Sequence, residues 1–250
     1  KNIVRYISQE FHKKTYFRQV LLSYIVVSCF TFLIFSILLL SKIQQENNRT
    51  ILNFGWQNIE QAMSFNNSSL HDISNYAYQM LDDAATYKLL YDDTFDLQTS
   101  ITSREIYDRI QNSSSMIISL DFINFSTGTV LTKTRRMSLD KYYDKDLLEY
   151  ISTLVPSRRP VFFQPRESYF SGNHTQPQRV LSLIFYTNRR GALVINLDYD
   201  TYASQINLAR NSENMNLIIV NNNHFVMAAS QDDYFMQDFS DNPLYLEILR

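Results

Sequence analysis

Arginine pairs are the residues in this sequence best suited to hold a small anionic ligand. They occur at Arg135-Arg136, Arg158-Arg159 and Arg189-Arg190, and a guanidinium presents a planar fork of donors that matches a carboxylate. The first pair follows a predicted strand end and the third lies in a predicted tight turn, where arginines are usually solvated. Arg158 and Arg159 precede a short predicted strand, residues 161–163. We therefore take Arg158 and Arg159 as candidate ligand contacts, with a solvated surface as the alternative.

Aromatic side chains cluster in the same part of the sequence and could line a pocket. The ring gives apolar contact, and a tyrosine hydroxyl can orient a sugar or a small carboxylate. Aromatic residues make up 14% of the chain, so ordinary core packing explains such a set equally well. The aromatic candidates for ligand binding are Tyr142, Phe163, Tyr169 and Tyr186.

Residues for catalysis, metal binding or cofactor binding are not assembled in this sequence. Its four glycines are scattered, its one cysteine (Cys29) excludes a disulfide framework, and its four histidines lack metal-ligand spacing. Acid pairs such as Asp82-Asp83 lack a partner histidine and are read as solvated surface. A net charge of −2 gives no basic field for nucleic acid. We expect no catalytic residue, no metal site, no cofactor and no enzyme activity within these residues.

An uncharged apolar stretch, residues 20–40, is the strongest single feature. A helix of 21 residues at about 1.5 Å per residue crosses the roughly 30 Å hydrocarbon layer of a membrane. Residues 1–19 are basic, and basic flanks stay on the cytoplasmic side. We expect a protein of the cell membrane with a cytoplasmic N-terminus at 1–19 and a transmembrane helix at 20–40. The residues from about 43 onward are expected to be extracytoplasmic.

Residues 43–92 are predicted to form one long helix, because apolar positions recur at alternating spacings of three and four. Such a seam can pack on a sheet of the same chain or face a second copy in a homodimer, and the two can coexist. The candidate residues of the dimer seam are Ile59, Met63, Leu70 and Ile73.

The pattern after the long helix predicts an α+β fold with antiparallel strands. Strand-forming runs at 117–133, 161–163, 179–186 and 192–197 surround a helix predicted from about 139 to 154 with Ser138 as its N-cap. Asp198 reads as the N-cap of the next helix. A second strand–turn–strand unit at 215–229 has asparagines 221–223 in its turn, where we expect positive φ. We assign 93–198 to a membrane-distal PAS-like domain and 199–250 to the start of a truncated membrane-proximal one.

The order of these elements resembles the double Cache domain of bacterial transmembrane receptors. The hairpin at 122–131, the strand at 191–200 and the entry to the membrane span at 14–24 carry this resemblance. The layout looks most like membrane-bound AraC-type transcription regulators, with sensor histidine kinases next. The Tyr/Arg/Trp/Asp signature of amino-acid-binding Cache receptors cannot be placed, because Trp56 is the only tryptophan and lies near the membrane end.

The resemblance implies a ligand sensor that signals across the membrane. We expect an extracytoplasmic ligand-sensing module, a homodimer, and a small-molecule ligand such as a sugar or a small carboxylate. DNA would be contacted only through an AraC-type module beyond residue 250. The first alternative is the ectodomain of a sensor histidine kinase, with its kinase domain beyond residue 250, or of a chemoreceptor. The second is an anchored surface solute-binding protein or enzyme.

Overall fold

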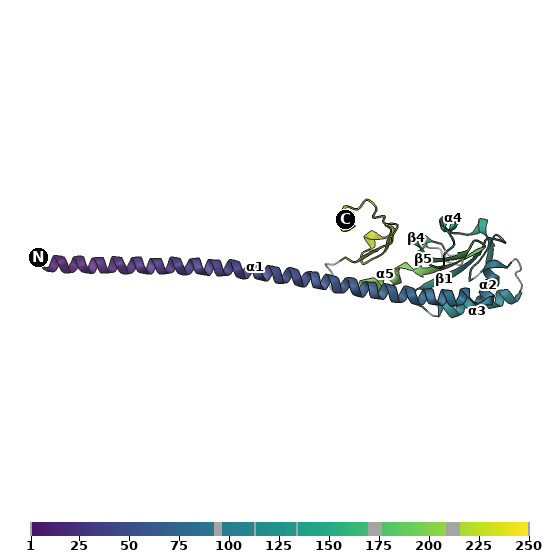
Figure 1. Ribbon diagram of the computed structural model, residues 1–250, viewed down its shortest axis with the longest axis horizontal. Helices are drawn as coiled ribbons and strands as arrows, with labels where there is room; N and C mark the ends of the chain where they lie inside the picture. Colours follow the sequence, from purple (N-terminus) through teal and green to yellow (C-terminus); the bar gives the residue numbers. More distant parts are fainter. Residues whose placement is uncertain are drawn as a thin grey trace. The chain divides into compact units, whose positions relative to one another are not determined.

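The computed structural model describes residues 2–92, 97–112, 114–133, 135–169, 177–208 and 216–249 (Figure 1). Helix α1 (Asn2–Leu81) begins the chain. The chain divides into two compact units, residues 1–56 and residues 57–250, and each unit is described by itself.

The first unit consists of the N-terminal part of α1. The described helical stretch Tyr16–Leu81 contains an 18-residue window with a mean hydropathy of 2.4, and none of that window is buried. Among the described residues it is the one helix long and apolar enough to cross a membrane. Apolar side chains such as Phe32 and Leu38 are exposed along this part of the helix. Such a surface suits lipid as its surroundings, in agreement with the predicted membrane helix.

The second unit is built on a six-stranded antiparallel sheet, which confirms the predicted α+β fold. The strand order is β3-β2-β1-β6-β5-β4. Tight connections join β1 to β2 and β5 to β6. The strands are β1 (Ile117–Asn124), β2 (Thr129–Leu131), β3 (Arg136–Ser138), β4 (Val161–Ser168), β5 (Gln178–Asn188) and β6 (Gly191–Asp198).

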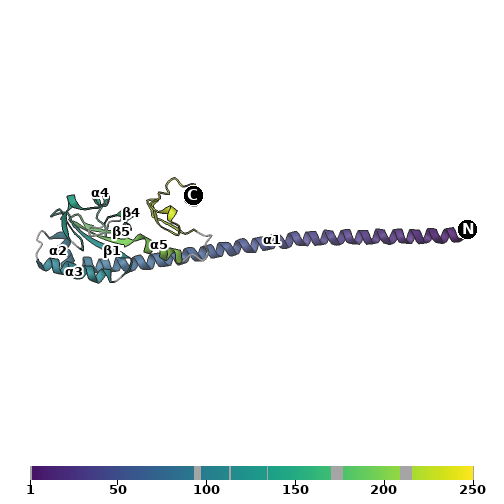
Figure 2. The ribbon, with the colours of Figure 1, turned by 180° about the vertical axis from the view of Figure 1, so that it is seen from behind.

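Helices cover both faces of this sheet, as the ribbon shows from two sides (Figures 1 and 2). The C-terminal part of α1, α2 (Ala84–Tyr91) and α3 (Leu97–Gln111) pack on one face, whose core includes Leu193 and Ile195. Helix α4 (Lys145–Thr153) covers the other face, whose core includes Val194. Successive residues of a strand point to opposite faces, so each inner strand contributes to two separate cores.

The helix predicted at 43–92 is interrupted in the structure. Helix α1 ends at Leu81 and α2 begins at Ala84. The side chain of Asp83 accepts a hydrogen bond from the Ala85 amide at 3.2 Å, so Asp83 is the N-cap of a new helix. The sequence predicted Asp82 and Asp83 to be solvated surface residues, but Asp83 caps the start of α2.

The helix predicted at 139–154 is also shorter than expected. A 3₁₀ turn, η1 (Leu139–Lys141), precedes α4, and the Ser138 side chain makes no capping hydrogen bond. Asp144 caps α4 by accepting a hydrogen bond from the Leu147 amide at 3.1 Å. The cap prediction was wrong at Ser138, because the extended chain at Tyr142 separates the two pieces.

The chain continues into a smaller second sheet. Strands β7 (Ile218–Val220) and β8 (Val226–Ala229) form this sheet, and the other elements of this part of the chain are α5 (Tyr199–Leu208), η2 (Asp232–Tyr234) and α6 (Pro243–Ile248). The Thr201 amide donates to Asp198 Oδ1 at 2.6 Å, which confirms the predicted cap. Strands β7 and β8 pair antiparallel, as predicted.

The turn between β7 and β8 is formed differently from the prediction. Positive φ falls on His224 (67°) and not on the asparagines before it. Asn221 acts through its side chain instead: its Oδ1 accepts from the amides of Asn223 at 2.9 Å and Phe225 at 3.0 Å. An asparagine that closes a turn this way needs no left-handed backbone.

The predicted dimer seam is divided by the packing of α1. Ile73 is buried in the core of its own chain and Leu70 packs partly against that core. Ile59 and Met63 are exposed. The part of the seam from Leu70 onward therefore packs on the same chain, and a dimer through Ile59 and Met63 stays a prediction.

Candidate functional site

Three polar side chains lie on the α4 face of the sheet, where the strand pattern calls for apolar residues. They are Asp121 on β1, Ser182 on β5 and Asn196 on β6. All three residues are buried, and at most 1% of the surface of each is exposed. The register places Asn196 opposite Ser182 on one side and Ser119 on the other. The strands thereby bring these side chains together without any loop.

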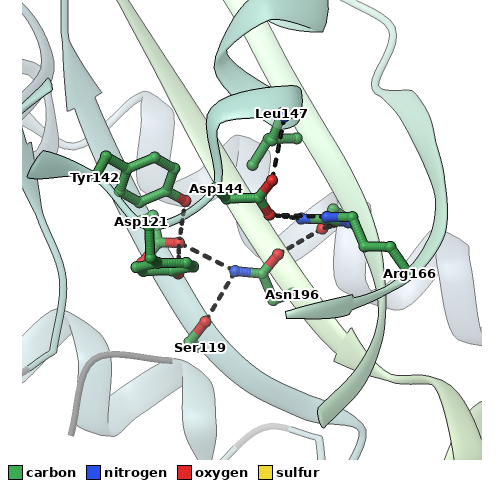
Figure 3. A network of polar contacts seen from close by, with 9 residues as sticks. Ser119, Asp121, Tyr142, Asp144, Leu147, Arg166 and Asn196 are labelled. Carbon is green, nitrogen blue, oxygen red and sulfur yellow. Dashed lines mark hydrogen bonds and ion pairs between the residues drawn. The ribbon is translucent and has the colours of Figure 1, made fainter. Parts of the chain in front are cut away.

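Asn196 is the centre of the hydrogen-bond network that results (Figure 3). Its Nδ2 donates to Asp121 Oδ2 at 3.0 Å and to Ser119 Oγ at 2.9 Å. Its Oδ1 accepts from Ser182 Oγ. Both ends of the amide are therefore engaged, and a buried polar group that is fully engaged stabilises one arrangement of the strands.

Two tyrosines from the segment between η1 and α4 complete one side of Asp121. The hydroxyls of Tyr142 and Tyr143 each donate to Asp121 Oδ2 at 2.7 Å. With Asn196, three donors converge on this one oxygen. Among the described residues, no partner reaches the other oxygen, Oδ1, although it is buried. A carboxylate oxygen in this position is a vacant acceptor, and leaving it unpaired is unfavourable.

The surroundings of Asp121 raise its pKa to about 6. The main cause is burial, which disfavours the charged carboxylate. The hydrogen bonds from Tyr143, Tyr142 and Asn196 lower the pKa, and the nearby charge of Asp144 raises it further. Burial also raises the pKa of Tyr142 well above its ordinary value, so this hydroxyl stays a neutral donor. Asp121 can thus change its charge near neutral pH.

Arg166 connects this network to the start of α4. Its Nε donates to Asp144 Oδ2 at 2.8 Å, its Nη2 forms an ion pair with the same oxygen, and its Nη1 donates to Ser182 Oγ at 2.9 Å. The guanidinium lies over the ring of Phe163, 4.7 Å from its centre. Charge-assisted bonds of this kind are among the stronger ones in proteins.

A β-bulge in β4 is what brings Arg166 to this face. The pairing of β4 with β5 shifts between Phe163 and Arg166: Phe163 lies opposite Ser182 and Arg166 opposite Val180. In a regular strand, residues three apart would point to opposite faces. The extra residue of a bulge re-aims the side chain that follows it, so Phe163 and Arg166 share one face.

The structure brings together half of the site residues predicted from the sequence. Tyr142 belongs to the network, Phe163 lies under Arg166, and Tyr186 packs partly on the same core. Arg158 and Arg159 are exposed, and the backbone carbonyl of Arg158 accepts from the Tyr78 hydroxyl. Tyr169 is 59% exposed.

The site residues predicted from the sequence did not include Asp121, Asn196 or Arg166. The signal for the first two was a polar residue at a position that the strand alternation assigns to the interior: an aspartate between Leu120 and Phe122, and an asparagine between two apolar residues of β6. For Arg166 the signal was Pro165, because proline inside a strand occurs mainly at edges and bulges.

Comparison with known proteins identifies the fold of this unit. No family model matches the chain, and a comparison with curated proteins found no match. The sensor domain of the Vibrio cholerae histidine kinase DctB is 13% identical, with 81% of this chain and 76% of that chain covered and a TM-score of 0.50. This likeness shows the fold.

Two other solved structures are similar at lower scores. The ligand-binding domain of the Pseudomonas aeruginosa PAO1 amino acid chemoreceptor PctB, in complex with L-Arg, is 12% identical over 72% of this chain and 70% of that chain, with a TM-score of 0.45. The sensory domain of the Campylobacter jejuni chemoreceptor Tlp3, with isoleucine bound, is 11% identical over 79% and 78%, with a TM-score of 0.46. The structural neighbours are Cache-type sensor domains of histidine kinases and chemoreceptors.

Proposed function

We propose that this chain is the anchored, extracytoplasmic ligand-sensing part of a bacterial transmembrane signal receptor. The observation that carries the proposal is a buried polar network with one vacant carboxylate oxygen, Asp121 Oδ1, on a Cache-type sheet. The apolar N-terminal helix supports a membrane anchor. The named neighbours are sensory domains and not enzymes, which supports a non-enzymatic role.

A histidine kinase or a chemoreceptor is the better-supported output for this sensor. The named neighbours come from these two classes. An AraC-type output, and the DNA contact that it would bring, rests on the order of elements in the sequence alone. We therefore place the kinase or chemoreceptor first and the AraC-type regulator second.

The charges of the network favour a ligand that donates hydrogen bonds to Asp121. The vacant Oδ1 requires a donor, such as a hydroxyl or an amine. A carboxylate ligand would meet Asp121 and Asp144 together, and the buried guanidinium beside them, that of Arg166, is already bound to Asp144. Bringing like charges together in a buried site is unfavourable. Of the two ligand classes expected from the sequence, a sugar thus has the stronger support.

A ligand screen with a matched pair of variants tests this function. Thermal unfolding of residues 1–250 in detergent micelles, with a panel of sugars, amines and small carboxylates, would find a ligand that raises the unfolding temperature. We expect Asp121→Asn to weaken its binding at least tenfold and Asp140→Asn, at an exposed aspartate on η1, to leave it unchanged. If both variants bound the ligand equally well, the network would not be part of the binding site.

The anchor and its orientation need a separate test. In a Cys29→Ser background, a cysteine placed at the exposed Val155 should react with a membrane-impermeant maleimide added to intact cells. Protection of this cysteine until the cells are lysed would place the second unit in the cytoplasm and contradict a receptor that senses outside.

A further inference from the structure

A concave site lies on the opposite face of β4 from Arg166. It is a cleft of about 440 Å³ between α1, the start of β4, α5 and the β7–β8 hairpin. Phe162, which points away from the α4 face, packs with the core on the α1 side of the sheet. Sites for small molecules commonly have volumes of about 300–1,000 Å³, so this cleft is large enough for one.

The walls of the cleft are apolar and its polar groups are uncharged. Leu70, Phe162 and Met227 contribute apolar surface. Asn66 on α1, Tyr202 on α5 and asparagines 221–223 of the hairpin contribute amides and a hydroxyl. None of the described residues that line the cleft carries a charge. This composition differs from that of the network around Asp121.

The polar groups of the cleft are held in place by the protein. The Tyr202 hydroxyl donates to Asn66 Oδ1, which leaves the two N–H donors of that amide. Asn221 closes the hairpin turn by accepting from two backbone amides. The turn that carries Asn222 is therefore fixed before any ligand arrives, which reduces the entropy lost on binding.

We propose that this cleft binds an uncharged, hydroxyl-rich small molecule of about the size of one sugar ring. The apolar face of such a ring would cover Phe162 and its neighbours, and its hydroxyls would exchange hydrogen bonds with the amides of Asn66 and Asn222. A charged molecule finds no opposite charge among the lining residues, and moving an unpaired charge out of water is strongly unfavourable.

Occupation of the cleft gives the receptor a second input, a consequence that rests on the proposed function. One bound molecule would contact α1, β4 and the β7–β8 hairpin at once. It would stabilise the arrangement of these elements in which all three contacts are made, and a ligand shifts a conformational equilibrium by its difference in affinity for the two states.

Calorimetric titration of residues 1–250 in detergent micelles tests the proposal. The probes are common neutral aldopentoses, aldohexoses and their polyols, with glucuronate and glucosamine as charged counterparts of glucose. We expect saturable binding of at least one neutral probe, a loss of at least tenfold with Leu70→Trp, which narrows the cleft, and no change with Leu208→Trp at a leucine that is 78% exposed. Asn222→Ala, at an exposed turn residue, should weaken binding several-fold without disturbing β4.

Three results would overturn the proposal: no saturable binding of any neutral probe, a preference for glucuronate or glucosamine over every neutral probe, or binding that neither Leu70→Trp nor Asn222→Ala weakens. Asp121→Asn separates this inference from the proposed function. Neutral-probe binding lost in Asp121→Asn but kept in the two cleft variants would assign the sugar to the network, which overturns the cleft and keeps the sensor. Binding that depends on the cleft alone supports the inference even if no ligand is found for Asp121.

Discussion

The α4 face and the α1 face of strand β4 carry two contrasting polar sites. On the α4 face, Arg166 and Asp144 form a buried ion pair, and Asp121 has one oxygen satisfied by three donors and the other left vacant. On the α1 face, the cleft beside Phe162 is open and lined by neutral groups. A closed charged network derives its strength from low dielectric surroundings and is sensitive to any lost partner. An open neutral cleft is preformed and tolerates substitution.

The two sites differ because one strand changes its register midway. Before the bulge, Phe162 faces α1 and Phe163 faces α4; after it, Arg166 joins Phe163 on the α4 face. The bulge therefore supplies the network with its only described buried arginine without altering the cleft. If this contrast is correct, substitutions on the α4 face should have larger effects on stability than matched substitutions at the cleft.

The largest effect is expected for Arg166→Ala. It leaves Asp144 buried without its cation, and breaking a buried ion pair from one side typically destabilises a protein by about 3–5 kcal/mol. Urea unfolding followed by circular dichroism would measure the change in the free energy of unfolding. Arg189→Ala, at an exposed turn, is the control and should lie within about 0.5 kcal/mol of the parent protein. A loss below about 1 kcal/mol for Arg166→Ala would contradict the closed network.

Asp121→Asn should change how stability depends on pH. The pKa of Asp121 is about 6 in the folded protein against an ordinary 3.8, so the folded state binds more protons between these values. The free energy of unfolding therefore falls as pH rises from about 4 to about 7, by up to about 3 kcal/mol from this residue.

Unfolding in urea at pH 4.5 and pH 7.5 would test this. The fall should be smaller in Asp121→Asn than in the parent protein, and Asp140→Asn should keep the parental fall. Equal pH dependence in the parent and in Asp121→Asn would show that the carboxyl is not the titrating group.

A matched pair of tyrosine substitutions compares the two sites directly. Tyr142→Phe removes one of the donors to Asp121, and Tyr202→Phe removes the hydrogen bond to Asn66. Each loss should lower the free energy of unfolding by about 1 kcal/mol, more for Tyr142 because its partner is a buried carboxylate. Only Tyr142→Phe should shift the pH range over which stability changes. A shift of this pH range by the same amount with Tyr202→Phe would show that the two sites are coupled.

The smallest effect on stability is expected outside both sites, at the exposed part of the predicted dimer seam. Ile59→Glu and Met63→Glu alter side chains that are 40% and 57% exposed, so the free energy of unfolding should change by less than about 0.5 kcal/mol. Cysteines at these positions should nevertheless cross-link between copies in membranes if the dimer forms there. Efficient cross-linking at the exposed Tyr76 but not at Ile59 would contradict the predicted seam.

The sequence predicted the hairpins and much of the sheet, because their signals are local. Alternating apolar residues, together with Gly128, whose φ is 64°, were enough to predict β1 and β2. Asp198 was enough to predict the start of α5. The break at Asp83 and the cap at Asp144 were missed because an aspartate on the surface and an aspartate at a cap look alike in sequence. Tyr142 was found as one aromatic among many, without its partner.

The hydrogen-bond network around Asp121 could not be predicted for a different reason. Asp121, Asn196 and Arg166 are distant in sequence, and their meeting depends on the strand order and on the register shift in β4. Neither is encoded by residues next to each other. The polar residues inside apolar strands could have been noticed, but their partners could not have been named.

Asp144 both binds Arg166 and fixes the beginning of α4. One of its oxygens receives the Leu147 amide and the other receives Arg166. Any event that draws the guanidinium toward a new anion frees this side chain to rotate, and the first turn of the helix then loses its fixed starting point. Fraying would begin at the Leu147 amide, where hydrogen exchange should quicken before the rest of the molecule responds.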